Sequence, residues 1–308
     1  MDQESSLNLI NIYGSDYDYF SKVSGNIKEF KLKYDPIGAL ESFKPVLQKK
    51  IFQVNEFSLA NYTLMRDRKV DSMMAIPVFL NRAFRHGSLY VNKESDLVHP
   101  RDLKNKTVGA KEYTQTAGVW WRGTMIDEYD LHWTDIKWVV SSEQRFDPPG
   151  EAAVEMVEGD LEQLVIEGKI DAFLAPTTED SKKESSDQKL RPLFINTEEI
   201  ERDYFSRTGI YPLNHAMVIH KQCLSDFPTL PKVLFDAFSS SKKEFYNQNG
   251  VYSPWGDKID YDPIQFGLTN KNSKVIKTLL RYLFEQKFIS KTPDLESLFV
   301  EGSKDFID

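Results

Sequence analysis

Residues 51–80 read IFQVNEFSLANYTLMRDRKVDSMMAIPVFL, and this stretch decides the fold. Residues 51–54 predict a short strand, and Ser58 stands where an N-cap begins a helix over residues 59–68. Residues 72–78 predict a second, apolar strand. A strand, a helix and a strand in succession are typical of α/β layering around a mostly parallel sheet.

The same alternation continues on both sides of this stretch. Further strands are predicted over residues 7–13, 29–34, 88–91, 107–110, 135–139, 172–175 and 210–219. Further helices are predicted over residues 38–50, 117–129, 161–167, 198–207, 230–246 and 273–286. A polar segment at 92–106 interrupts the order, and residues 177–190, rich in Ser, Lys, Asp and Glu, predict an exposed loop.

Strand–helix units on either side of the polar segment predict two α/β lobes. One lobe would comprise residues 1–95 and 209–308, and the other residues 96–208. Two crossings, near residues 92–100 and 208–212, would join them. In this arrangement polar loops face a cleft between the lobes, which is a common place for small-ligand sites.

The composition is that of a folded, mildly acidic protein. The 308 residues include 39 Lys and Arg against 47 Asp and Glu, a formal net charge of −8, and 40% are hydrophobic. An acidic surface disfavours binding to nucleic acid, which needs clustered Lys and Arg. No apolar run of about 18 residues could span a membrane, and the first residues lack the pattern of a secretory signal. We therefore expect a cytoplasmic protein with no nucleic-acid or membrane partner.

Several kinds of chemistry are absent from the sequence. Cys223 is the single cysteine, which excludes an internal disulfide and a cysteine-rich metal site, and we expect it to be a buried, unreactive thiol. There is no GxxxxGK[ST], no GxGxxG after a strand, no HExxH and no GxSxG. These absences argue against nucleotide-driven and serine-hydrolase chemistry.

Four segments carry polar residues at predicted strand ends or helix starts: EFSLANY at 56–62, AIPVFLNRAFRH at 75–86, KEYTQTAGVWWRG at 111–123 and RTGIYPLNH at 207–215. In this order and at these separations, they resemble the 4,5-dihydroxyphthalate decarboxylase family. The likeness runs from about residue 56 to residue 308. Members of that family resemble type II periplasmic solute-binding proteins, so the resemblance implies a two-lobed type II periplasmic-binding-protein-like fold.

The chain departs from the family pattern in three places. Gly87 stands where a small hydroxylated residue is usual, and residues 178–189 form a polar insertion. Tyr129-Asp130-Leu131 replaces an expected Tyr-Gly-Val turn. The first departure lies beside His86 and bears on the identity of the substrate more than on the fold.

The resemblance implies cofactor-independent loss of CO2 from a hydroxylated aromatic dicarboxylate such as 4,5-dihydroxyphthalate, giving a catechol acid. Such a site needs a cation for the retained carboxylate, a base for the phenol and an acid for the ring carbon. Histidine suits the proton transfers because an imidazole titrates near neutral pH. Arginine holds a carboxylate with better geometry than lysine does.

His86 is the first candidate for proton transfer and His215 the second, because each ends one of the four segments. The alternative is that either is a core or hinge histidine bonded to the backbone. His99, His132 and His220 lie outside the segments, and we expect surface or packing roles for them.

No cofactor is expected. The alternative is a divalent metal bound by the two candidate histidines with Glu56 or Glu112, because imidazole and carboxylate suit several divalent ions. The spacing matches no local ligand pattern. The expected partner is a small aromatic carboxylate, and the sequence leaves a homo-oligomer open.

Arg82 and Arg85 lie three residues apart and so on opposite faces of a strand. Arg85, beside His86, is the preferred clamp for a substrate carboxylate, and a salt bridge is the alternative for either arginine. Arg122 lies within a predicted helix, where a structural ion pair is favoured over contact with a ligand.

Ser58 and Thr116 would each begin a helix after a strand, where free backbone N–H groups can bind an anion; ordinary capping is the alternative. The remaining substrate-binding candidates are polar or aromatic residues of the same segments, namely Asn61, Glu112, Tyr113, Trp120 and Tyr211, with Tyr62 in a similar position. For Trp120, which shares a helix face with Thr116, core packing competes with stacking on a bound ring.

A second hypothesis is a non-catalytic small-acid binding or sensor protein of the solute-binding class, since one fold hosts many functions. Proton-transfer groups at the ligand would distinguish the decarboxylase from the receptor.

Overall fold

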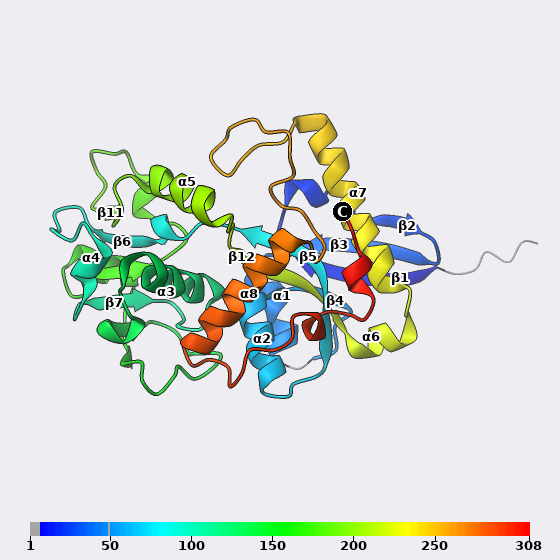
Figure 1. Ribbon diagram of the computed structural model, residues 1–308, viewed down its shortest axis with the longest axis horizontal. Coiled ribbons are helices and arrows are strands. Elements are labelled where there is room, and N and C mark those ends of the chain that lie inside the picture. The colour runs from blue at the N-terminus through cyan, green and yellow to red at the C-terminus, as the bar shows by residue number, and fades with distance from the viewer. Residues whose placement is uncertain (1–6, 49) are drawn as a thin grey trace, which may run out of the picture. The chain divides into compact units, whose positions relative to one another are not determined.

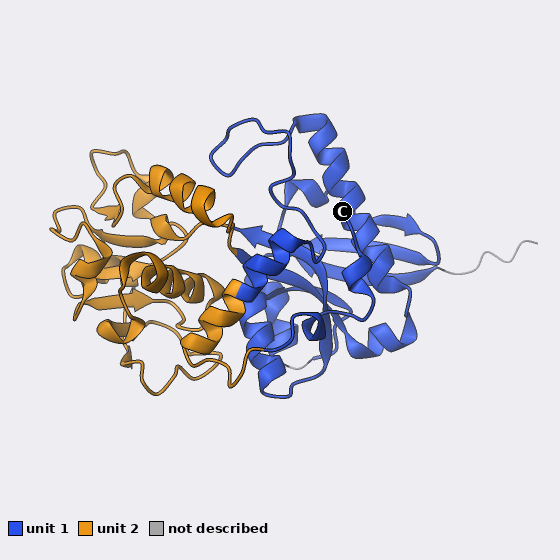
Figure 2. Ribbon diagram, in the orientation of Figure 1, with its two compact units in different colours: residues 1–82, 213–277, 293–308 blue, residues 83–212, 278–292 orange. Residues whose placement is uncertain are grey.

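The computed structural model describes residues 7–48 and 50–308. Residues 1–6, which belong to the first predicted lobe, and residue 49, within the predicted helix 38–50, lie outside the described residues. The chain divides into two compact units, coloured separately in Figure 2. Unit 1 comprises Met1–Arg82, Leu213–Lys277 and Pro293–Asp308, and unit 2 comprises Ala83–Pro212 and Thr278–Thr292.

The boundaries of the units differ from the predicted lobe boundaries. The chain leaves unit 1 after Arg82 and returns at Leu213, whereas the sequence places these crossings near residues 92–100 and 208–212. Residues 278–292 also lie in unit 2, although the sequence assigns them to the other lobe. A polar stretch such as 92–106 marks an exposed connection, and this one connects two strands of the same unit.

Unit 1 is built on a six-stranded mixed sheet (Figure 1). In spatial order its strands are β2 (Gly25–Ile27), β3 (Phe30–Pro36), β1 (Asn8–Gly14), β4 (Val54–Ser58), β12 (Leu213–His220) and β5 (Met73–Arg82). β1 runs parallel to β3 and β4, while β12 is antiparallel to both β4 and β5. The carboxyl ends of β3, β1, β4 and β5 therefore lie at one edge of the sheet, where β12 begins.

Helices cover both faces of this sheet. The helices of unit 1 are α1 (Ala39–Leu47), α2 (Leu59–Asp67), α6 (Lys221–Asp226), α7 (Leu230–Asn249) and the part of α8 (Asn270–Glu285) up to Lys277. On one face, Phe238 of α7 packs with Ile12 of β1 and Val54 of β4 in a buried apolar cluster. Phe57 lies three residues beyond Val54 and so points to the other face. There it meets Phe43 of α1 edge-on, with ring centroids 5.2 Å apart.

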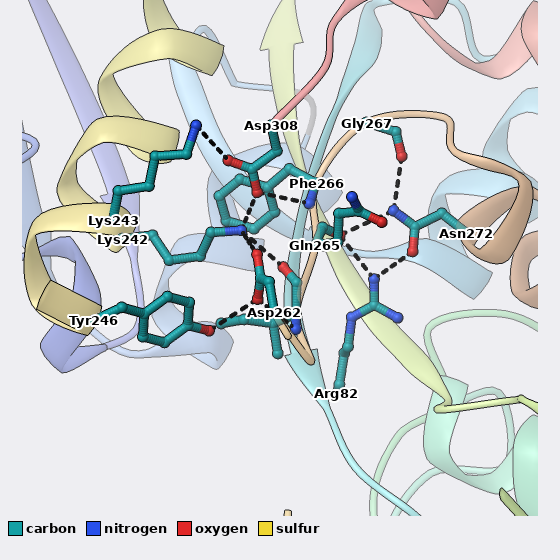
Figure 3. Close-up of polar contacts among 11 residues, drawn as sticks. Arg82, Lys242, Lys243, Tyr246, Asp262, Gln265, Phe266, Gly267, Asn272 and Asp308 are labelled. Carbon is teal, nitrogen blue, oxygen red and sulfur yellow. Dashed lines mark hydrogen bonds and ion pairs between the residues drawn. The ribbon is translucent and has the colours of Figure 1, made fainter. Parts of the chain in front are cut away.

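A buried ion-pair cluster holds two distant segments of unit 1 to α7 (Figure 3). Lys242, which is fully buried, donates from Nζ to the carboxylates of Asp262 and Asp308 and to the carbonyl oxygen of Ile264. The Tyr246 hydroxyl donates to Asp262 at 3.0 Å. Because a buried ammonium is tolerated only when it is paired, these carboxylates fix where the chain returns to the helix.

Unit 2 is built on a second six-stranded mixed sheet. In spatial order its strands are β11 (Leu190–Pro192), β6 (Leu89–Asn92), β10 (Ala172–Leu174), β7 (Thr107–Ala110), β8 (Lys137–Val140) and β9 (Val154–Met156). β10, β7, β8 and β9 are parallel, and β6 is antiparallel to β10 and β11. The helices are α3 (Thr116–Tyr129), α4 (Leu161–Ile166), α5 (Thr197–Thr208) and the end of α8.

The core of unit 2 contains an apolar cluster around α4 and a close contact between α3 and the end of α8. Val165 of α4 packs into a buried cluster with Phe173 of β10. The end of α8 lies against α3, where Trp120 meets Tyr282 edge-on with ring centroids 5.5 Å apart. Gly123 makes this contact possible, because a Cβ there would lie 2.2 Å from the Tyr282 ring.

The predicted alternation of strands and helices is confirmed in both units, and the elements expected at 59–68 and 107–110 lie where the sequence placed them. As expected, most strands of each sheet run in one direction, namely β1, β3, β4 and β5 in unit 1 and β7, β8, β9 and β10 in unit 2. Both sheets are nevertheless mixed, because β2 and β12 in unit 1 and β6 in unit 2 run antiparallel to their neighbours. The strand expected at 51–54 lies at Val54–Ser58, whose polar but buried residues hide the apolar pattern. The sequence predicts no strand at β2, β9 or β11, each of which has three residues.

The structure also bears on the expectations about membrane-spanning segments and about Cys223. Among the described residues, no helix combines the length and the apolar character needed to cross a membrane. Cys223 is confirmed as a buried thiol, 6% exposed, and burial raises its pKa to about 11. A thiol that stays protonated and buried is unreactive.

Candidate active site

Polar residues gather at the edge of the unit 1 sheet where β1 and β4 end. β4 is buried along its whole length, and Glu56 within it is fully buried. Burying an ionised carboxylate is unfavourable unless hydrogen bonds and positive charge compensate for the lost water. The residues around Glu56 supply these compensating contacts.

Three donors surround the Glu56 carboxylate. The backbone N–H of Ser15, directly after β1, donates to Oε2 at 2.6 Å, and the Tyr17 hydroxyl donates to Oε1 at 2.8 Å. Nδ1 of His215 in β12 lies 2.5 Å from the same Oε1. Burial opposes ionisation of Glu56, but these contacts and the charge of His215 outweigh it, so the pKa of Glu56 lies below its ordinary value. Glu56 is therefore an ionised acceptor at neutral pH.

The sheet register and one glycine bring these groups together. His215 pairs with Ser58 of β4, which places it beside the end of that strand. Tyr34 of β3 donates its hydroxyl to the carbonyl oxygen of Ser15 at 2.6 Å. A Cβ at Gly14 would lie 2.5 Å from the Tyr34 hydroxyl and 3.3 Å from Oε2 of the carboxylate. Position 14 has no room for a larger residue.

Glu56 fixes the tautomer of His215. Because an ionised carboxylate only accepts, we assign the proton to Nδ1 of His215, which puts the lone pair of the neutral ring on Nε2. The His215 side chain is 13% exposed, and Phe43 of α1 packs edge-on against its ring with centroids 5.1 Å apart. A carboxylate that orients an imidazole and stabilises its protonated form is the arrangement of a general base.

Ser58 and Asn61 lie at the start of α2, at the same edge of the sheet. Ser58 is the N-cap, and its Oγ accepts from the backbone N–H of Asn61 at 3.2 Å. Capping by Ser58 is thus confirmed. Asn61 is fully buried, and contact of either residue with a substrate stays a prediction.

Arg82 and Tyr62 have structural partners within unit 1. Arg82 donates from Nη2 to the side-chain oxygen of Asn272 at 2.6 Å and to the carbonyl oxygen of Gln265 at 3.1 Å (Figure 3). The Tyr62 hydroxyl donates to the carbonyl oxygen of Leu298 at 2.5 Å. Both side chains hold C-terminal segments to the sheet, and a carboxylate-binding role for Arg82 stays a prediction.

His86 and Arg85 belong to unit 2. His86 is 2% exposed and lies in a 3-10 turn, η2 (His86–Ser88), with the Tyr204 ring centroid 5.0 Å from its own. Within the described ranges, neither His86 ring nitrogen has a hydrogen-bond partner, and neither does Nε of Arg85. Burial, and then the charge of Arg207, lowers the pKa of His86 to about 4, and burial lowers the pKa of Arg85 to about 10.

His86 therefore differs from His215, because it is buried and neutral at pH 7 whereas His215 has a carboxylate partner. The expected alternative, a histidine bonded to the backbone, is not met among the described residues either. The neighbouring Gly87 is explained by packing: a Cβ there would lie 2.8 Å from Cγ2 of Thr197 at the start of α5. A larger residue at position 87 would force the Thr197 side chain to shift.

Glu112 lies after β7, at the carboxyl edge of the unit 2 sheet, and pairs with an arginine that the sequence does not single out. Nε of Arg145 lies 3.0 Å from Oε2 of Glu112, and the Thr114 hydroxyl donates to Oε1 at 2.7 Å. The backbone N–H of Tyr113 donates to Gln144 at 2.7 Å. These contacts join the segments after β7 and β8 and make Glu112 an orienting group for Arg145.

The aromatic candidates Tyr113 and Trp120 are fully buried in the core of unit 2. Core packing is confirmed for Trp120, which lies against Tyr282. The Tyr113 ring carries the guanidinium of Arg122, 4.0 Å from its centroid. Arg122 donates to Gln286 at 2.7 Å. The ion pair expected for Arg122 is wrong, because no carboxylate pairs with it in the described part of the chain.

The other candidates of unit 2 have local roles. Thr116 is the first residue of α3, and Gln115 occupies the N-cap position without a side-chain cap bond, so the cap expected at Thr116 is wrong by one residue. Tyr211 is half-buried and stacks on Phe84 with ring centroids 4.8 Å apart. Binding of a substrate by Thr116 or Tyr211 stays a prediction.

The three remaining histidines have the structural roles expected of them. Nδ1 of His99, His132 and His220 accepts from the backbone N–H of Arg101, Thr134 and Gln222 respectively, which caps a helical turn in each case. For the metal alternative, no three His, Cys, Asp or Glu side chains in the described ranges gather as a ligand set. Glu56 and His215 come together in unit 1, whereas His86 and Glu112 lie in unit 2.

The structure thus joins one predicted residue, His215, to three that the sequence does not assign to catalysis, Ser15, Tyr17 and Glu56. A signal for Ser15 exists in the Gly-Ser pair that follows the first strand, since a backbone N–H at a strand's carboxyl end is free to bind an anion. Tyr17 carries no such signal. Convergence of residues from both units on one substrate stays a prediction.

The fold is that of a type II periplasmic-binding-protein-like protein. The chain is similar to the periplasmic aliphatic sulphonate binding protein SsuA from Escherichia coli, with a TM-score of 0.55 and 11% identity over 97% of this chain and 99% of that one. A sulfonate-binding protein SsuA from Methylobacillus flagellatus KT gives a TM-score of 0.55 and 11% identity over 96% and 92%. At this identity the likeness concerns the fold alone.

Sequence relatives narrow the class. The chain is similar to 4,5-dihydroxyphthalate decarboxylases from Comamonas testosteroni, 30% identical over 201 residues, and from Pseudomonas putida, 30% identical over 151 residues. The matches cover 62% and 47% of this chain and 61% and 54% of those proteins, less than two thirds of either relative. No protein-family model matches the chain. The expected resemblance to the 4,5-dihydroxyphthalate decarboxylases is confirmed.

Proposed function

We propose that this chain is a cofactor-independent carboxy-lyase that acts on a hydroxylated aromatic dicarboxylate such as 4,5-dihydroxyphthalate. Its products would be a catechol acid and CO2, as in the breakdown of aromatic compounds. The similarity to two proteins named 4,5-dihydroxyphthalate decarboxylase supports this reaction class.

The observation that carries the proposal is the 2.5 Å contact between Nδ1 of His215 and Oε1 of Glu56 at the carboxyl edge of the unit 1 sheet. In open α/β sheets, small ligands bind outside the carboxyl ends of the strands. The contact gives His215 a fixed tautomer and an ionised partner, which are the two requirements for a base at a phenol.

The proposed reaction consists of proton transfers and the breaking of one carbon–carbon bond. Nε2 of His215 removes the proton of the hydroxyl para to the departing carboxylate, and Glu56 stabilises the imidazolium that forms. The phenolate raises electron density at the ring carbon that bears the carboxylate, and this carbon takes up a proton. The bond to the carboxylate then breaks, its electron pair restores the aromatic ring, and CO2 leaves. The imidazolium of His215 returns its proton to the phenolate, which regenerates the phenol and the neutral base. One proton is consumed in the net reaction and comes from water.

The test is turnover of 4,5-dihydroxyphthalate by purified protein, followed as CO2 release and catechol-acid formation. We expect turnover by the wild type and its loss by at least a hundredfold in His215→Ala, because general-base catalysis contributes about 10²- to 10⁴-fold. His132→Ala, which removes a surface histidine, should leave the rate unchanged. Folded wild-type protein that releases no CO2 from this acid or from related hydroxybenzoates would refute the proposal.

A second candidate is a small-acid-binding protein that does no chemistry. The observation in its favour is that the similar solved structures are named as sulphonate-binding proteins. Binding isotherms separate the two functions. In a decarboxylase, His215→Ala binds the acid and fails to turn it over, whereas in a receptor the same variant changes affinity only and the wild type never releases CO2. The same pair of measurements on His86→Ala tests the first sequence-based candidate.

A further inference from the structure

Two donors compete for one oxygen of Glu56. The Tyr17 hydroxyl is 2.8 Å from Oε1, and Nδ1 of His215 is 2.5 Å from the same atom, while the Ser15 N–H holds Oε2. A second bond to the same oxygen withdraws negative charge from the His215 contact. Tyr17 is therefore coupled to His215 through this shared oxygen.

Tyr17 is held in place as a permanent donor. It precedes η1 (Asp18–Phe20), and its ring stacks on Tyr19 at 5.3 Å and meets Phe20 edge-on at 5.6 Å. Burial, and then the negative charge of Glu56, raises the pKa of Tyr17 far above its ordinary value. The hydroxyl thus stays protonated throughout the range in which an imidazole titrates.

We propose that Tyr17 is a positioning residue that, by sharing Oε1 of Glu56 with His215, sets the pH at which His215 becomes a base. The predicted change in the pH profile of kcat/KM rests on the proposed function. The predicted change in the titration of the His215 ring rests on the hydrogen bonds alone. Its substrate class is the same hydroxylated aromatic acid, whose phenol must lose a proton near neutral pH.

The titratable groups that face this cluster come from four elements. They are Glu56 of β4, His215 of β12, Tyr34 of β3, and Asp16, Tyr17 and Tyr19 around η1. The Tyr17 hydroxyl donates to the carboxylate, whereas the Tyr34 hydroxyl donates to the backbone of Ser15. Tyr34→Phe therefore removes a hydroxyl from the same cluster and leaves both bonds to Oε1 in place.

The proposal predicts opposite pH shifts for two variants. In Tyr17→Phe the carboxylate oxygen Oε1 keeps only its contact with Nδ1 of His215, so its full negative charge stabilises the imidazolium. The acid limb of the kcat/KM profile then moves up by about one pH unit, as expected for the loss of one hydrogen bond to a charged group. In Glu56→Gln the imidazolium loses its partner, so the limb moves down and kcat falls. Tyr34→Phe keeps the limb at its wild-type position.

Nuclear magnetic resonance of the histidine ring nitrogens gives a readout that needs no turnover. The signal of His215 is assigned by its loss in His215→Ala, and its titration midpoint is then measured in each variant. A midpoint about one pH unit above the wild type in Tyr17→Phe, with no change in Tyr34→Phe, supports the proposal. An unchanged or lower midpoint in Tyr17→Phe overturns it, whether or not the protein decarboxylates. Absent turnover with the expected midpoints would instead refute the proposed function alone.

Discussion

Nδ1 of His215 and Oε1 of Glu56 lie 2.5 Å apart although 159 positions separate the two residues in the chain. The contact exists because β12 inserts antiparallel between β4 and β5, so that His215 is paired with Ser58 beside the end of β4. A strand that returns from the far part of the chain thereby completes an acid–base pair that neither half of the sequence contains alone.

Gly14→Ala should disturb the contact between Glu56 and His215 by steric crowding. The new Cβ would lie 2.5 Å from the Tyr34 hydroxyl and 3.3 Å from Oε2 of Glu56. We expect a loss of about 1–3 kcal/mol in the free energy of unfolding, typical of overpacking. We also expect a loss of activity of tenfold or more, since displacements of about 1 Å at a reacting centre have effects of this size. Denaturant unfolding and kcat/KM are the measurements.

Two further variants test Gly14→Ala: one removes the steric clash, and the other is a control. Tyr34→Phe removes the nearest atom that the new methyl group meets, so Gly14→Ala with Tyr34→Phe should recover part of the lost stability. Gly150→Ala, with nothing within 4 Å of its Cβ, should leave stability within about 0.5 kcal/mol of the wild type. A double variant no more stable than Gly14→Ala would contradict the steric explanation.

His86 should make the protein sensitive to mild acid. Burial, and then the charge of Arg207, lowers its pKa to about 4 from the ordinary 6.5, so the unfolded chain binds a proton at a pH where the folded chain does not. A depressed pKa gives stability that is complete above pH 6.5 and is lost as the pH falls toward 4. At about 1.36 kcal/mol per unit, the free energy of unfolding should fall by roughly 2.5 kcal/mol between pH 7.5 and pH 4.5 from this group.

The test is denaturant unfolding at these two pH values. His86→Phe, which keeps a ring among Phe194 and Tyr204, should remove most of this acid-induced loss, whatever its stability at pH 7.5. His132→Phe serves as the exposed-histidine control and should keep the full loss. Equal pH dependence in wild type and His86→Phe would show that His86 is not buried and neutral in solution.

The sequence predicts the layering of this fold well because strands and helices leave periodic patterns of apolar residues over short distances. The helix that starts at Leu59 is such a case: its cap and its apolar face are local. β4 is the opposite case. It is buried on both faces yet carries Asn55, Glu56 and Ser58, so its sequence lacks the apolar pattern of a buried strand. Their hydrogen-bond partners stabilise these polar side chains.

The site is harder to predict for the same reason. His215 can be chosen from a motif, but Tyr17 reaches Glu56 across 39 positions and Ser15 contributes only its backbone N–H. His86 shows the converse, since it shares the motif context of His215 and lies in the packing of α5 instead. Which histidine receives a carboxylate partner depends on strand pairing between distant segments, and the amino-acid pattern around each histidine does not report this pairing.

Asp130→Gly should stabilise the protein. Asp130 ends α3 in the left-handed conformation with φ 54°, the position at which the related proteins are expected to carry glycine. Left-handed backbone is unfavourable for residues with a Cβ, and less so for Asp than for most. We expect the free energy of unfolding to rise by about 0.5–1 kcal/mol. The reverse change at the end of α5, Gly209→Asp at φ 66°, should lower the free energy of unfolding by a similar amount. A lower free energy of unfolding in Asp130→Gly would show that the Asp130 side chain matters more than the backbone.

The Lys242 cluster should show strong coupling between its charges. Lys242 is fully buried, and its Nζ lies 3.8 Å from the centre of the Phe266 ring besides pairing with Asp262 and Asp308. Burial opposes ionisation of Asp308, but the charge and hydrogen bond of Lys242 outweigh it and lower the pKa of Asp308 below its ordinary value. Removing the cation alone in Lys242→Met leaves Asp262 and Asp308 without the buried ammonium, although Nζ of Lys243 stays 4.0 Å from Oδ1 of Asp308. The loss of this buried partner costs about 3–5 kcal/mol.

A double-mutant cycle distinguishes charge pairing from simple packing. Asp308→Asn alone should also destabilise the protein, because the buried ammonium keeps only Asp262. Lys242→Met with Asp308→Asn removes opposite charges together, so it should cost less than the sum of the single changes by about 1–3 kcal/mol. A lowered pKa also means that the contribution of Asp308 is present above its unfolded pKa and is lost as the pH falls through the folded value. Strictly additive single changes, measured by denaturant unfolding at pH 7, would mean that Lys242 acts by packing on Phe266 and not by its charge.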